Sequence, residues 1–111
     1  MTVEDIRDYC LEKPGVTESL PFGPEVLVFK VKDKIFCLLP LDQHPTSFNV
    51  KCDPDRAIEL REQYPAVQPG YHMNKKHWNT VTVDGSLSAK LLKEFIDHSY
   101  ALVVKLKPAK S

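Results

Sequence analysis

The segment 71–80 holds the residue types of this chain that are best suited to contacting another molecule. It reads Tyr-His-Met-Asn-Lys-Lys-His-Trp-Asn-Thr and contains two of the four His residues, the single Trp and a Lys pair. Polar and amphipathic side chains of this kind are uncommon in cores and frequent at binding surfaces. The segment therefore predicts an exposed contact surface.

Nucleic acid is one partner that these side chains suit. Lysine ammonium groups neutralise phosphates, asparagine amides donate to backbone or base edges, and a tryptophan ring stacks on an unpaired base. The predicted contact segment is Lys75, Lys76, His77, Trp78 and Asn79, with an electrostatic flank of Lys30, Lys32 and Lys51. The alternative reading is that lysines at hairpins and edge strands only prevent aggregation and keep the surface soluble.

Composition narrows the classes of protein to consider. In 111 residues, 15 Lys and Arg balance 15 Asp and Glu, which argues against a strongly basic nucleic-acid binder but allows a local patch. The acidic N-terminus is unlike a signal peptide, and the absence of a long apolar run argues against a membrane span. Three cysteines without a CxxC pair fit reduced thiols, so we expect a cytoplasmic protein.

The residues match no template for a metal or catalytic site. His72 and His77 are five apart, and no paired CxxC spacing, GxSxG, P-loop or GxGxxG sequence occurs. Cys52 precedes a predicted helix N-terminus, which either lowers its thiol pKa or leaves it as a packed, inert side chain. We expect no cofactor, no metal and no catalysis. The enzyme alternative needs Tyr71, His72, His77 and Cys52 to converge in a cleft.

Periodicity and capping residues predict the elements. A helix begins after Thr2 and stops at Pro14-Gly15, and a loop covers 16–24. Strands are expected at 26–31, 35–39, 47–52 and 77–83, with a helix at about 54–64 and a last helix after Ser86 or Ser88. The order α-β-β-β-α-β-α predicts an α+β two-layer sandwich with the helices on one face of an antiparallel sheet.

Several motifs together resemble the MmcQ/YjbR family over nearly the whole chain. They are Pro14-Gly15-Val16-Thr17, Pro21-Phe22-Gly23, Val28-Phe29-Lys30-Val31, Lys51-Cys52-Asp53-Pro54 and the run 69–79. The resemblance implies a bacterial protein with a single domain, which we place at 1–104. The residues at 105–111 predict a basic tail. The resemblance also implies a frataxin-like (CyaY-like) or secretion-chaperone-like fold and DNA binding without established enzymatic activity.

The resemblance leaves other readings open. A frataxin-like fold draws attention to Glu4, Asp8 and Glu12 on the first helix, because frataxins are thought to hold iron on such a ridge; the plain reading is a solvated helix face. Phe22 in its proline-rich loop either contacts a partner, as in an interaction module that is a monomer or a homodimer, or plugs the end of the sheet. The segment 71–79 can also serve a small ligand, or simply lock its crossover onto the sheet.

Overall fold

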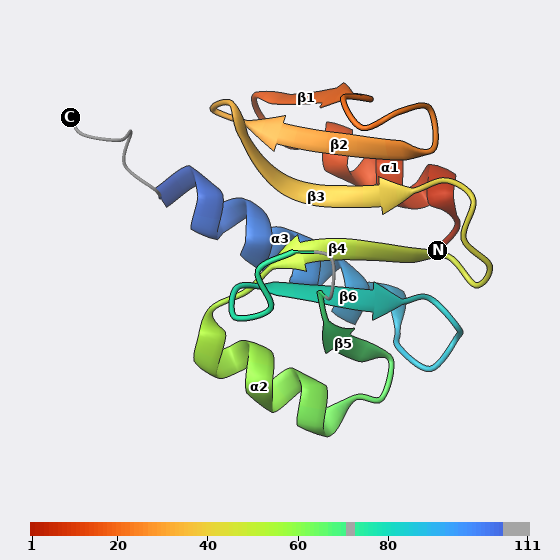
Figure 1. Cartoon of the computed structure of the whole chain (residues 1–111), viewed down its shortest axis with the longest axis vertical. Coiled ribbons are helices and arrows are strands. Elements are labelled where there is room, and N and C mark those ends of the chain that lie inside the picture. Colours follow the sequence, from red (N-terminus) through yellow and green to blue (C-terminus); the bar gives the residue numbers. More distant parts are fainter. Residues whose placement is uncertain (71–72, 106–111) are drawn as a thin grey trace.

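A six-stranded antiparallel sheet with helices on one face forms this chain (Figure 1). The computed structural model describes residues 1–70 and 73–105. The strand order is β1-β2-β3-β4-β6-β5. In chain order the elements are α1 Val3–Leu11, β1 Val16–Ser19, β2 Val26–Val31, β3 Lys34–Pro40, β4 Ser47–Lys51, α2 Pro54–Gln63, β5 Val67–Pro69, β6 Trp78–Thr82 and α3 Ala89–Lys105. The predicted α+β sandwich is confirmed.

The helices begin where their capping residues predict. Thr2 and Asp5 form a reciprocal capping box, each side chain accepting a hydrogen bond from the backbone N–H of the other, at 3.1 and 2.8 Å. Asp53 caps α2, with Pro54 at the first helical position. Ser88 caps α3 through a 3.1 Å bond from the backbone three residues on. No helix in the described residues is long and apolar enough to cross a membrane.

One face of the sheet makes the core with all three helices. Alternate residues of β2, such as Phe29 and Val31, point into it, as the period-two pattern predicts. Ser99 of α3 joins the two layers: its hydroxyl donates to the Phe36 carbonyl at 2.5 Å and accepts from the Lys51 amide at 2.9 Å. Because Ser99 is fully buried, these bonds fix α3 against β3 and β4.

Two short edge strands extend the predicted sheet. Strand β1 forms in what was expected to be a loop and pairs with β2, while β5 pairs with β6 at the opposite edge. Neither has a clear alternating apolar pattern in its sequence, because an edge strand buries few side chains. Pairing with the neighbouring strand holds it in place. Each is only three or four residues long.

The other face of the sheet carries no helix and turns toward the viewer in Figure 1. Its centre is apolar, with Val28, Leu38 and Trp78 buried together and Met73 packed against them. Asn49 and Thr80 continue the row on β4 and β6, joined by a 2.5 Å hydrogen bond from the threonine hydroxyl. We call this surface the open face.

Candidate functional site

The fold gathers lysines at one end of the sheet. Strands β2 and β4 finish at this end, β3 and β6 begin there, and α3 runs toward it (Figure 1). Lys32 and Asp33 make the tight β2–β3 turn, both with positive φ, as a two-residue hairpin turn requires. We define the lysine-rich end as Lys30, Lys32, Lys34, Lys51, Lys75, Lys76 and Lys105, together with His77.

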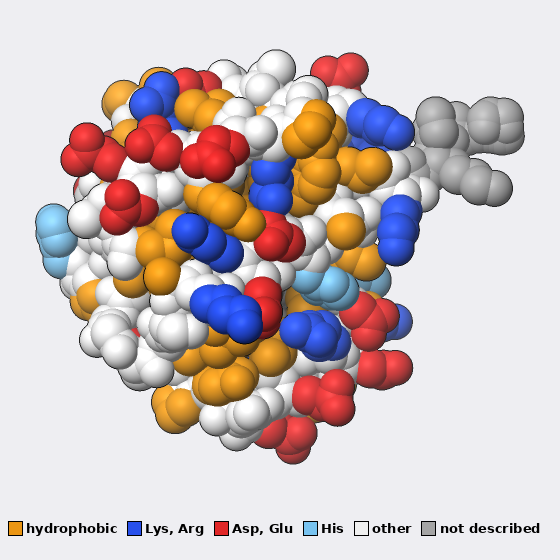
Figure 2. Space-filling model, turned by 180° about the vertical axis from the view of Figure 1, so that it is seen from behind, with side chains coloured by type: hydrophobic (Ala, Val, Ile, Leu, Met, Phe, Trp, Pro, Cys, Tyr) orange, Lys and Arg blue, Asp and Glu red, His pale blue; other side chains and the backbone are white. Residues whose placement is uncertain are grey.

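Charge is distributed unevenly although the chain is neutral overall. Along the chain, the acidic residues within four positions of the seven lysines are Asp33, Asp53 and Asp55. Seen from the helix side, Lys and Arg side chains flank the point where the described chain ends, while acidic side chains gather at the upper left and at the lower right (Figure 2). The ion pairs Arg7–Glu18 and Lys13–Asp97 lie outside the lysine-rich end. Lysines therefore concentrate at one end of a protein that is neutral overall.

The predicted contact segment enters this surface through a compact turn. The Asn74 carbonyl accepts from the amides of His77 and Trp78, at 3.1 and 2.9 Å, and its side chain accepts from the Lys76 amide at 2.9 Å. The turn leaves Lys75, Lys76 and His77 exposed. Three of the five predicted contact residues thus lie together on the surface.

Arg61 of α2 holds this turn in place. Its Nε donates to the Asn79 side-chain oxygen at 2.7 Å, and its Nη2 donates to the carbonyls of Trp78, at 3.2 Å, and Lys75. A planar guanidinium can serve several acceptors at once, which a lysine cannot do in the same geometry. The sequence analysis missed Arg61, because nothing in a helical arginine reveals that it reaches a segment 14 to 18 residues away.

The other two predicted contact residues are buried. Trp78 is 7% exposed on the open face, and Asn79 is 2% exposed on the core side. Gly70 lies against Trp78: a methyl group there would come within 3.0 Å of the Trp78 Cβ. The Lys51 ammonium lies 5.9 Å from the centre of the Trp78 ring. The burial of Trp78 supports, for this residue, the reading that the segment locks its crossover onto the sheet, whereas His77 is exposed.

The flanking lysines divide between two places. Lys30 and Lys51 point to the open face, because they pair with Ile35 and Trp78, which pack on that face. Lys32 lies in the hairpin turn and is exposed. Lys32 therefore does not share the open face with the other two, but it lies at the same end of the sheet.

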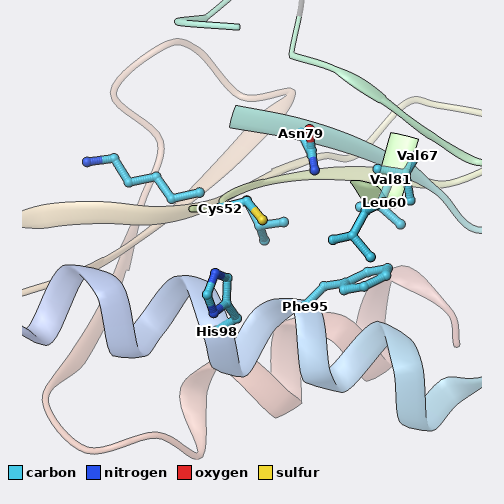
Figure 3. A pocket seen from close by; sticks show the side chains of 9 residues that line it. Cys52, Leu60, Val67, Asn79, Val81, Phe95 and His98 are labelled. Carbon is cyan, nitrogen blue, oxygen red and sulfur yellow. The ribbon is translucent and has the colours of Figure 1, made fainter. Parts of the chain in front are cut away.

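Cys52 and His98 meet in the core, where they line a small cavity (Figure 3). The cavity measures ≈ 10 Å³, about the space that one water molecule occupies. Burial raises the pKa of the Cys52 thiol to about 11 and lowers the pKa of His98. His98 Nε2 accepts from the Asp53 amide at 3.2 Å. Of the two readings of Cys52, the structure supports the packed, neutral thiol.

A separate hollow lies beside His77. It measures ≈ 220 Å³ and is lined by His77, Lys51, Leu102 and the 52–54 turn into α2. Tyr71 and His72, which the enzyme alternative also requires, lie outside the described residues. On α1, Glu4, Asp8 and Glu12 are exposed, and no three His, Cys, Asp or Glu side chains in the described part of the chain come together as metal ligands.

Comparisons with known proteins agree with the fold. The YjbR family model matches residues 11–102. The protein YbdF of Escherichia coli O157:H7 is 42% identical over 91% of this chain and 83% of its own length, and YjbR of Escherichia coli K12 is 34% identical over 97% and 92%. Protein DR2400 of Deinococcus radiodurans has a crystal structure that superposes with a TM-score of 0.91, at 46% identity over 98% of this chain and 83% of that one.

Proposed function

The chain belongs to the YjbR family, and we propose that it binds nucleic acid at the lysine-rich end, without catalysis. One observation carries the proposal: the ends of four strands and the end of α3 bring seven lysines to one end of the sheet, in a chain of zero net charge. Lysines distributed only for solubility would not require such a concentration. We place the activity in the cytoplasm, where the three free cysteines stay reduced.

The burial of Trp78 and Asn79 supports a binding mode directed at the nucleic-acid backbone. A tryptophan that is 7% exposed offers no ring face to an unpaired base, and the Asn79 amide oxygen already accepts from Arg61. What remains exposed is Lys75, Lys76 and His77. These side chains contact phosphates, with Lys30, Lys32 and Lys51 as the flank, so binding is directed at the backbone and carries little sequence preference.

A binding titration tests this proposal. Fluorescence anisotropy of a labelled 20-base-pair duplex, and of each of its single strands, is measured with the full chain at 20 mM salt. We expect binding to the duplex at least as tight as binding to the single strands, because no aromatic platform favours unpaired bases. Lys75→Ala/Lys76→Ala should weaken binding by roughly tenfold or more at this salt concentration.

The matched control removes two lysines from another part of the surface. Lys90 and Lys93 are exposed on the first turns of α3, at the opposite end of that helix from Lys105. Lys90→Ala/Lys93→Ala changes net charge by the same amount and should leave affinity within about twofold of the parent. No anisotropy change with duplex or single strand would contradict the proposal, and so would equal losses in the two double variants.

A further inference from the structure

The open face carries a groove that the lysine-rich end does not use. It measures ≈ 430 Å³ and is lined by Phe22, Val26, Leu38, Pro40, Asn49 and Met73. Val26, Leu38, Pro40 and Asn49 come from β2, β3 and β4, where Val26 pairs with Pro40 and Leu38 with Asn49. Phe22 comes from the β1–β2 connection and Met73 from the crossover between β5 and β6. The strands thus supply a floor, and two connections supply side chains beside it.

The groove is apolar except at one residue. Its size falls within the range of small-molecule pockets, roughly 300–1,000 Å³. Phe22 is 67% exposed, so a molecule lying in the groove would remove apolar ring surface from water. Methionine adapts its shape to what it contacts, which suits Met73 to a ligand site.

The exception is the amide of Asn49. Its oxygen accepts from the Thr80 hydroxyl at 2.5 Å, which directs the NH₂ group away from that bond. This NH₂ group has no hydrogen-bond partner among the described residues. A donor next to apolar side chains favours a ligand oxygen over another apolar atom. None of the described residues that line the groove is charged, so this lining offers no counter-ion for a carboxylate or an amine.

From these observations we propose that the groove binds a neutral small molecule with a flat apolar body and a carbonyl oxygen. The body lies against Val26, Leu38 and Met73 under the Phe22 ring, and the carbonyl accepts from the Asn49 NH₂ group. The volume admits a compact molecule rather than a folded partner, which would contact the wider open face.

The probe is benzamide, compared with toluene, which lacks the carbonyl. Both are titrated into the full chain while NMR follows the Asn49 side-chain NH₂ and the Met73 methyl group. We expect saturable shifts of both signals with benzamide in the millimolar range, and weaker binding of toluene. Asn49→Asp keeps an oxygen for Thr80 but removes the donor, so it should weaken benzamide roughly 3- to 10-fold and leave toluene unchanged.

Two further variants keep the test independent of any folding defect in Asn49→Asp. Val26→Phe fills the groove and should weaken both probes. Lys90→Ala, on α3 at the other face of the sheet, changes net charge by the same amount as Asn49→Asp and should change neither. Equal affinity of benzamide for the parent and Asn49→Asp would overturn the proposal. So would the same NMR shifts appearing without probe as the protein is concentrated, because the occupant would then be a second copy of the chain.

Discussion

Replacing Arg61 with alanine should destabilise the fold by about 2–3 kcal/mol. Arg61 donates to three acceptors, and their surroundings decide how much each bond is worth. The Lys75 carbonyl lies in an exposed turn and regains water, and the Trp78 carbonyl keeps a 2.9 Å bond from the Gly70 amide. The buried Asn79 oxygen loses its partner, at a cost of about 1–3 kcal/mol. The apolar stem of the arginine adds to the loss.

Urea unfolding followed by the fluorescence of the single tryptophan measures this loss, because Trp78 is buried and becomes exposed on unfolding. The midpoint should fall by about 1–2 M. Arg56→Ala is the matched control, since Arg56 lies on the same helix, is exposed, and makes no side-chain hydrogen bond or ion pair with the described residues. A change below about 0.5 kcal/mol for Arg61→Ala, as expected for an ordinary surface site, would refute the role of Arg61.

Three other predictions concern the core and its pH response. Ser99→Ala should cost about 2–4 kcal/mol in urea unfolding, because it leaves the Phe36 carbonyl and the Lys51 amide without their buried partner; an undiminished midpoint would contradict this. Gly70→Ala should lower the free energy of unfolding by about 1–3 kcal/mol in thermal unfolding, because the new Cβ would lie 3.0 Å from the Trp78 Cβ. A variant as stable as the parent would show that the backbone at Gly70 can move away from Trp78 at little cost. Burial and a 2.6 Å bond to Asp97 raise the pKa of Tyr9 from 10.0 to about 12, so the unfolded chain releases this proton first and stability should fall between pH 10 and 12. The same slope in Tyr9→Phe would contradict that assignment.

The fold could be predicted largely from the sequence because its signals are local. Thr2 with Asp5 and Asp53 with Pro54 mark helix starts within four residues, and alternation in β2 and β4 assigns each side chain to a face. Val67–Pro69 has no such signal, since a three-residue edge strand is ordered by its neighbour. The apolar residue type of Ile58 does not show that it is 55% exposed, because Ala57 and Leu60 set the buried side of α2.

The site was only partly predictable, because it depends on contacts between distant segments. The strand pattern of the sequence predicts which lysines lie at strand ends, and Lys75 and Lys76 are exposed as expected. The burial of Trp78 and Asn79 depends on their contacts with Gly70 and Arg61. No sequence pattern predicts these contacts. The pKa of Cys52 depends in the same way on burial under α3, and this effect outweighs the helix N-terminus that follows it in the chain.

The salt dependence of duplex affinity tests the proposed function most directly. Each phosphate contact contributes about 0.9 to the slope of log K against log salt concentration, so removing two should lower the slope by about 1.8. We predict this reduction for Lys75→Ala/Lys76→Ala and an unchanged slope for Lys90→Ala/Lys93→Ala. A slope that is the same in the parent and in Lys75→Ala/Lys76→Ala would contradict phosphate binding at the lysine-rich end.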